Sequence, residues 1–189
     1  MEIINNSKTA KEEMDIRKTV AETFDKSFFV EAGAGAGKTT LIELIDKREG
    51  VYVVPGAKIG YARQNMSQID MDKTVLENVR DVSIQKESIA RLILARLLLT
   101  ERDIQKKASD LSGGERMKLS FAMLFVSDVN FLILDEPTNY LDIPSIEALE
   151  KLLMEYEGTL IFVSHDKTFV EHVATEKLLI QDGKIIKSE

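Results

Sequence analysis

The stretch VEAGAGAGKTTLI, residues 30–42, decides the fold class of this chain. Its centre, AGAGAGKT at 32–39, fits the pattern of a phosphate-binding loop, with alanine in place of the first glycine. The apolar run SFFVEA before it predicts a strand over 27–32, and TTLIELIDK after it predicts a helix over 39–47. A phosphate loop requires this order of strand, loop and helix, so we prefer it to an ordinary flexible glycine turn.

The residues of the loop have distinct expected roles. Backbone N–H groups around the three glycines can turn inward on phosphates, and the helix that begins near Lys38 adds its positive end. The Lys38 ammonium can reach the β- and γ-phosphates, and the Thr39 hydroxyl can bind Mg²⁺. The predicted nucleotide-binding residues of the loop are Gly33, Ala34, Gly35, Ala36, Gly37, Lys38, Thr39 and Thr40.

Apolar runs and helical patterns alternate along the rest of the chain. Residues 74–125 are predicted to be mostly helical, a helix with an early proline covers 144–156, and 177–187 forms a hairpin turning at Asp182-Gly183. This alternation predicts an α/β fold with a mainly parallel sheet flanked by helices on both faces. The predicted strands after the loop are 51–54, 58–62, 131–134 and 159–164.

Composition limits the classes of protein to consider. The 189 residues suffice for one domain, and the absence of cysteine excludes disulfides, thiolate metal sites and cysteine nucleophiles. No apolar run approaches the roughly 18 residues that span a membrane, and residues 1–15 are too polar for a secretory signal. A net charge of -7 argues against direct DNA binding through bulk charge. We expect a single-domain cytoplasmic protein without membrane contact.

Two acids follow the apolar strand in NFLILDEPTNYLD, residues 130–142. The strand places Asp135 at the carboxyl edge of the sheet, where it can hold Mg²⁺ through water. Glu136 then lies next to the γ-phosphate and can polarise an attacking water. Without the upstream loop, a strand ending in a solvated acidic turn would be the simpler interpretation.

The motif LSGGE at 111–115 has two interpretations. Ser112 and Glu115 have the spacing of a capping box, which predicts a well-capped helix start. The same helix start, with a serine and two glycines, is also an anion site for a phosphate from another molecule or domain. Local chemistry leaves both interpretations open.

Five motifs in order resemble an ATP-binding cassette. They are Gln64 in GYARQ, then LSGGE, FLILDEP, NYLD and FVSHD, which are similar to the Q-loop, signature, Walker B, D-loop and switch-histidine motifs. The wording DEPTNYLD and its flanks KIGYARQN, DKTVLENV and LSGGERMKLSFAMLF resemble the ABC-F subfamily, soluble cassette proteins that act on ribosomes and include antibiotic-resistance factors. The resemblance covers about 49–189 and is nearest to a second cassette.

This resemblance implies a role for each matching residue. Gln64 would contact Mg²⁺ and sense the γ-phosphate, Asp135 would hold the metal, and Thr39 would complete the metal ligands. Glu136 would act on the water, and His165 would contact the γ-phosphate. The residues expected at the interface with ATP held by a second cassette are Ser112, Gly113, Gly114, Glu115 and Asp142. His172 lacks such a context, and we expect it on the surface.

The resemblance also implies a division of the single domain. Residues 65–125 would form a helical subdomain with the signature motif, and 126–189 a core with Walker B and the switch histidine. Residues 1–48 would form the head with the phosphate loop.

The head departs from the cassette pattern GxNGxGK[ST], because Ala32 and Ala34 stand where glycine and asparagine are expected. A predicted helix over 9–24, with capping-box spacing at its start, replaces the antiparallel strands that carry an adenine-stacking aromatic residue. Residues 1–45 instead resemble the first motif of a superfamily 1 DNA helicase. We expect a composite joined within 39–47, with a diverged natural cassette as the alternative; the adenine-stacking residue stays unassigned.

The leading functional hypothesis is a cassette module that binds and hydrolyses ATP with Mg²⁺ through a head-to-tail dimer with a second cassette. The resemblance implies the ribosome as a partner. The alternative is a catalytically silent nucleotide-binding or engineered chimeric fragment without ribosomal function, since the adenine platform, second cassette and interdomain linker are missing.

A helicase fits poorly with DEPTN and lacks room for a second motor domain. A Rad50 or SMC cassette would need a coiled coil between Gln64 and Leu111, and a transporter subunit is disfavoured by DEPTNYLD.

Overall fold

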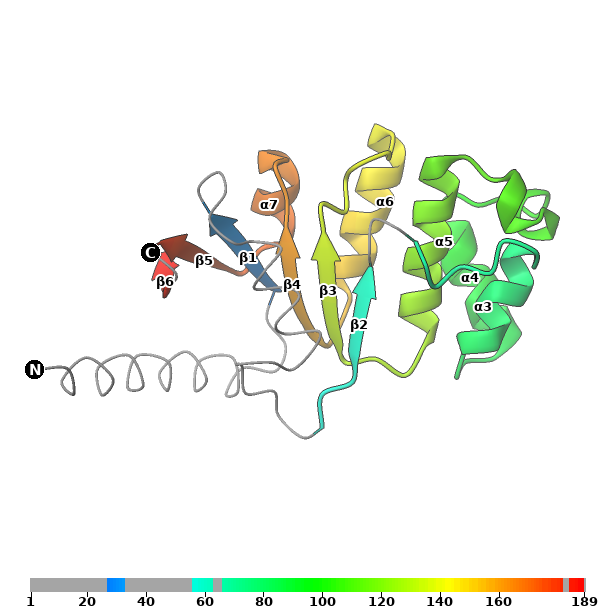
Figure 1. The fold of residues 1–189 in the computed structure, drawn as a ribbon, viewed down its shortest axis with the longest axis horizontal. Helices are drawn as coiled ribbons and strands as arrows, with labels where there is room; N and C mark the ends of the chain where they lie inside the picture. The colour runs from blue at the N-terminus through cyan, green and yellow to red at the C-terminus, as the bar shows by residue number, and fades with distance from the viewer. Residues whose placement is uncertain (1–26, 33–55, 63–65, 182–183, 189) are drawn as a thin grey trace, which may run out of the picture.

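The structure, a computed structural model, describes residues 27–32, 56–62, 66–181 and 184–188 (Figure 1). The predicted helices over 9–24 and 39–47, the predicted strand over 51–54 and the turn Asp182-Gly183 lie outside these residues. The strands are β1 (Ser27–Ala32), β2 (Ile59–Ala62), β3 (Phe131–Asp135), β4 (Thr159–Val163), β5 (Glu176–Gln181) and β6 (Lys184–Ser188). The helices are α3 (Val75–Val82), α4 (Glu87–Arg96), α5 (Gly113–Val126), α6 (Ile143–Met154) and α7 (Lys167–Val173), with short 3₁₀ turns η1 (Asp103–Gln105) and η2 (Ala108–Asp110).

The six strands form one sheet in the order β2-β3-β4-β1-β5-β6. All neighbouring pairs are parallel except β5 and β6, which pair in antiparallel fashion from Lys177 opposite Ser188 to Gln181 opposite Lys184. The predicted α/β fold, mainly parallel sheet and C-terminal hairpin are therefore confirmed. The predicted helix over 144–156 is α6, which has its proline in the first turn.

Side chains on both faces of the sheet are buried. On one face, Phe162 of β4 lies between Phe29 of β1 and Phe169 of α7, with ring centroids 5.7 and 5.4 Å away. These rings belong to a larger hydrophobic cluster, to which all five helices that the structure describes contribute. On the other face, residues such as Phe28 and Ile133 are fully buried. Successive strand residues point to opposite faces, so burial on both explains the continuous apolar runs in the sequence.

Helices α3, α4 and α5 gather at one end of the molecule, beyond β2 (Figure 1). α4 buries Ala90 and Leu94, whereas Ile89 and Leu92 are 41% and 53% exposed. The apolar block that marks this helix in the sequence therefore includes its outer face. At the end of α4, the Arg96 guanidinium binds both carboxylate oxygens of Glu155 with N to O distances of 2.6 and 2.8 Å, joining α4 to the end of α6.

His172 is exposed, as expected, but it is not without contacts. Its Nδ1 lies 2.9 Å from Oε2 of Glu150, a nearly buried carboxylate on α6. The hydrogen bond to Glu150 and then its charge raise the pKa of His172, with smaller contributions from Glu171 and Asp166. The pair therefore links α6 and α7 most strongly when the ring is protonated.

We expect His172→Gln to destabilise the protein in a pH-dependent way. Because the folded-state pKa of His172 is raised, its contribution is fully present below the ordinary pKa of about 6.5 and is lost as pH rises through the folded value. The drop in Tm should thus be larger at about pH 5.5 than at about pH 8.5 in thermal denaturation. Glu150→Gln, the matched control, should remove the same pH-dependent part; an equal drop for His172→Gln at both pH values contradicts the prediction.

Candidate functional site

The carboxyl ends of the parallel strands meet at one edge of the sheet. β3 ends at Asp135, which lies in register with Val163 at the end of β4. β1 runs in the same direction as β4 and ends at Ala32, immediately before the predicted glycines of the phosphate loop. The predicted loop and the predicted acids therefore leave the sheet at the same edge, which is where open α/β sheets bind ligands.

Glu136 turns the chain sharply after β3. Its φ is 50°, in the left-handed region that residues other than glycine rarely adopt, and its N–H donates to the Val163 carbonyl at 2.9 Å. Such a conformation costs about 1–3 kcal/mol and is concentrated at functional sites. The Glu136 side chain is 13% exposed, so its carboxylate is held against the protein.

The Glu136 carboxylate contacts His165 with both oxygens. Oε2 accepts the backbone N–H of His165 at 3.1 Å, and Oε1 lies 3.2 Å from the ring Nε2. The ring itself is 80% exposed at the edge of the sheet. Asp166 fixes the following turn, because its carboxylate accepts the backbone N–H groups of Thr168 and Phe169 and so caps α7. The structure thus brings together two predicted catalytic residues from the ends of β3 and β4.

Ser112 caps α5 as its spacing predicts. Its hydroxyl accepts the Glu115 N–H at 3.3 Å, and its own N–H donates to the Glu115 carboxylate at 2.8 Å. Hydrogen bonding to Ser112 lowers the pKa of Glu115 below its ordinary value. Of the two interpretations of LSGGE, the capped helix start is therefore present, and it leaves Ser112 and Gly113 exposed.

The two glycines of this motif have different surroundings. A Cβ added to Gly113 would meet no atom of the described chain within 4 Å, whereas one on Gly114 would lie 2.5 Å from the carbonyl oxygen of Tyr140. Tyr140 itself has a φ of 66°. Gly114 is thus required where the turn around Tyr140 packs on α5, and the contact joins the signature motif to the turn after β3. Sequence reasoning missed this contact, since nothing in the motif indicates its partner.

Asp142 is the N-cap of α6. Its Oδ1 accepts the N–H of Ser145 at 3.2 Å and is also bonded by the Ser145 hydroxyl. The hydrogen bond from the Ser145 hydroxyl lowers the pKa of Asp142. The sequence analysis did not include Ser145 in the site. The signal that could have found it is an aspartate shortly before an early proline, which marks a helix start whose N-cap accepts from a residue in the first turn.

Several predicted site residues lie outside the described part of the chain. Among the predicted metal ligands, only Asp135 is described, and no three histidine or acidic side chains of the described residues gather to hold a metal ion. Mg²⁺ needs few protein ligands, since it binds through one or two carboxylates together with phosphates and water. A carboxylate at this edge fits that donor set. The residues not described are Gly33, Ala34, Gly35, Ala36, Gly37, Lys38, Thr39, Thr40 and Gln64.

Comparisons with known proteins agree with this geometry. The erythromycin resistance ATP-binding protein MsrA of Staphylococcus epidermidis is 42% identical over 155 residues, covering 82% of this chain and 32% of MsrA. The ribosome protection protein VmlR of Bacillus subtilis is 36% identical over 157 residues, covering 81% of this chain and 29% of VmlR. The chain thus spans less than a third of the length of either relative.

The fold is likewise similar to a solved cassette. The dimeric structure of MJ0796, a bacterial ABC transporter cassette, superimposes with a TM-score of 0.70 at 20% identity, covering 88% of this chain and 86% of that one. None of the helices in the described ranges has the length and apolar character to cross a membrane.

The protein-family model described as ABC transporter matches residues 33–139. This match begins at Gly33 and includes the phosphate loop, so the comparisons give no support to a helicase-like head or to a chimera. It also covers more than half of the sequence, and the chain therefore belongs to the ABC transporter family.

Proposed function

We propose that this chain is an ATP-binding cassette module that binds ATP and hydrolyses it. The observation that carries the proposal is the contact of Glu136 with His165 at the carboxyl edge of the sheet. Glu136 is the general base that orients and polarises the attacking water, and His165 contacts the γ-phosphate. A partly buried carboxylate held in a strained turn is suited to this role, because its position is fixed before the nucleotide binds.

The phosphate loop and the Glu136–His165 pair of one chain act on the same nucleotide. The backbone N–H groups of the loop surround the phosphates, and Lys38 neutralises their charge. Mg²⁺ would be held by Thr39, Gln64 and Asp135, and when bound it neutralises charge on the β- and γ-phosphates. The position of Asp135 supports this assignment. Its strand, β3, pairs with β4, and β4 pairs with β1, the strand that leads into the phosphate loop.

A second cassette completes the site. We infer that Ser112, Gly113 and Gly114 close over ATP bound to the partner, while Asp142 lies at the same interface. The open space beside Gly113 supports this, because packing within the described chain does not explain a glycine there, and a close approach by phosphate does. MJ0796, whose fold is similar, was solved as a dimer. In this arrangement 65–125 acts as the helical subdomain, 126–189 as the core, and 1–48 supplies the phosphate loop.

The subfamily proposed is ABC-F. The wording DEPTNYLD supports it, and the relatives MsrA and VmlR are named for erythromycin resistance and ribosome protection. The ribosome is accordingly the proposed partner of the whole protein, which would act in the cytoplasm. The alternative of a catalytically silent module rests on the unusual loop, with Ala32 and Ala34, and on the unassigned adenine-stacking residue.

Purified protein assayed for phosphate release over a concentration series tests the proposal. We expect Mg²⁺-dependent turnover that rises faster than linearly with protein concentration, because each complete site needs two chains. Lys38→Ala should abolish it, since the variant loses the charge that binds the β- and γ-phosphates. Nucleotide binding without any turnover by the parent chain would favour the silent module instead.

A further inference from the structure

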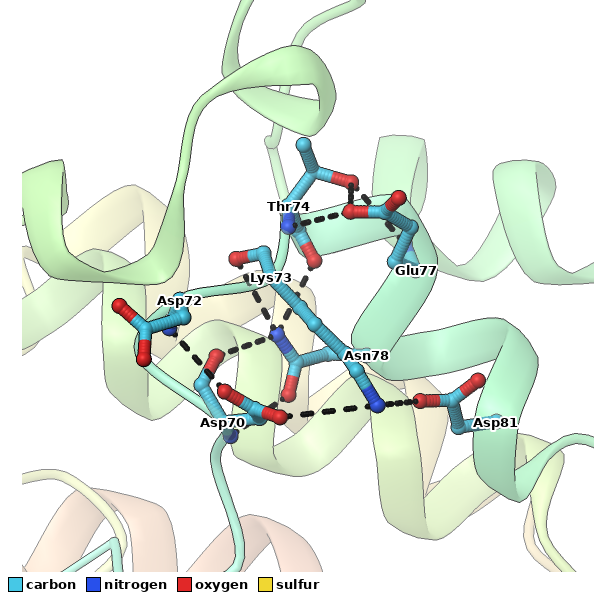
Figure 2. Close-up of polar contacts among 7 residues, drawn as sticks. All are labelled: Asp70, Asp72, Lys73, Thr74, Glu77, Asn78 and Asp81. Atoms are coloured by element: carbon cyan, nitrogen blue, oxygen red, sulfur yellow. Dashed lines mark hydrogen bonds and ion pairs between the residues drawn. The ribbon is translucent and has the colours of Figure 1, made fainter.

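Residues 70–74, which immediately precede α3, are held in place by one buried side chain. Asn78 is 2% exposed, and its carboxamide faces this segment (Figure 2). Its Oδ1 accepts the Asp70 N–H at 2.8 Å, and its Nδ2 donates to the carbonyls of Asp70 and Thr74 at 2.9 and 3.0 Å. Donor and acceptor of one amide thus hold both ends of the segment.

The ion pairs in the same cluster are of a different kind. Figure 2 shows the Lys73 ammonium between Asp81 and Asp70, at 2.7 and 3.5 Å. All three of these side chains are about half exposed. Exposed ion pairs contribute little to stability. Loss of a buried hydrogen-bonding group costs more, because its partners are left unsatisfied. Asn78, rather than Lys73, therefore fixes the position of the segment.

The fastened segment in turn holds the chain that leads into the signature motif. The Val75 N–H donates to the Lys106 carbonyl at 3.0 Å, the Ala108 N–H to the Lys73 carbonyl at 2.9 Å, and the Ser109 N–H to the Met71 carbonyl at 3.1 Å. Thr74 and Lys107 form an antiparallel bridge. Ala108 and Ser109 belong to the short turn η2, so only Asp110 and the buried Leu111 separate this pairing from Ser112.

We propose that Asn78 is a positioning residue that sets the place of the signature serine, Ser112, against the nucleotide of the partner cassette. This inference rests on the proposed function. Asn78 touches neither nucleotide nor metal; it fixes 70–74, these residues fix 106–109, and the turn η2 carries that position to Ser112. An asparagine is required because the site uses an acceptor and a donor on one short side chain.

Hydrogen exchange tests the mechanical part without any nucleotide. In Asn78→Leu, the backbone amides of Ala108 and Ser109 should exchange about tenfold faster than in the parent, because the carbonyls of Lys73 and Met71 that accept them are no longer held in place by Asn78. Lys73→Ala, the control from the same cluster, should leave them unchanged. Asn78→Asp, which keeps shape and acceptor but loses the donor, serves if Asn78→Leu does not fold. Unchanged exchange in the folded Asn78 variant overturns the proposal.

Mixed dimers test the functional part. Asn78→Leu should keep the parental affinity for ATP, because its own phosphate loop is intact. Its kcat should fall at least about tenfold, because Ser112 is no longer correctly placed against the ATP of the partner. Mixed with Lys38→Ala in equal amounts, it should recover about a quarter of the parental rate per chain, since half of the dimers are mixed and each has one complete site. Failure of the mixture to recover activity overturns the proposal. If the parent has no turnover, the proposed function fails, and hydrogen exchange still decides the role of Asn78.

Discussion

Replacing Glu136 by glutamine should lower kcat for ATP hydrolysis by about 10²–10⁴-fold, the usual contribution of a general base. Glutamine keeps the size of the side chain and one oxygen that can accept the His165 N–H at the position of Oε2. It removes the negative charge and the basicity that act on the water. ATP binding through the phosphate loop should persist, so the variant should accumulate as the ATP-bound dimer.

Steady-state phosphate release measures the first effect, and light scattering with and without ATP measures the second. A useful control is Glu155→Gln. This acid lies at the C-terminal end of α6, where it binds Arg96. The variant should hydrolyse ATP at the parental rate. The assignment of Glu136 fails if Glu136→Gln hydrolyses ATP as fast as the parent.

Phe162→Ala should cause the largest loss of stability, about 3–5 kcal/mol in the free energy of unfolding. Phe162 has no exposed surface, and its ring is enclosed between Phe29 and Phe169. Truncation removes these contacts and leaves a cavity where a sheet strand and a helix meet. Because domains have about 5–15 kcal/mol of stability in total, this change would consume a large part of it.

Urea denaturation of parent and variant measures this difference. Phe162→Leu, which retains most of the volume, should cost less than about 1.5 kcal/mol and serves as the matched control. A change below about 1 kcal/mol for Phe162→Ala would mean that the core around β4 collapses to fill the cavity.

The strands were predictable because burial dictates their composition. β1 and β4 lie inside a sheet buried on both faces, so Phe28 to Val30 and Leu160 to Val163 are continuous apolar runs, and β1 matches its predicted range of 27–32. The helix start at Ser112 was also predictable, because its capping box is local and a spacing of three residues specifies both partners.

Contacts between distant segments could not be predicted in the same way. The carbonyl of Tyr140 that requires Gly114 is a backbone atom, and any residue at position 140 would supply it. Likewise, the sequence indicates that α4 is a helix, but its face toward α5 is set by tertiary packing, which leaves Leu92 exposed. Asn78 lies in DKTVLENV, a stretch that resembles the ABC-F subfamily, but the sequence does not indicate what it binds, because its partners are backbone groups whose side chains do not matter.

The order of the sheet has a consequence for synthesis of the chain. β1 is the first described strand in sequence, yet its two neighbours in the sheet begin at Thr159 and Glu176. During translation, the apolar residues Phe28 and Phe29 leave the ribosome well before either neighbour exists. Pairings over such long separations form slowly, and unpaired apolar strands aggregate. The nascent chain must therefore keep β1 shielded until β4 and β5 have been made.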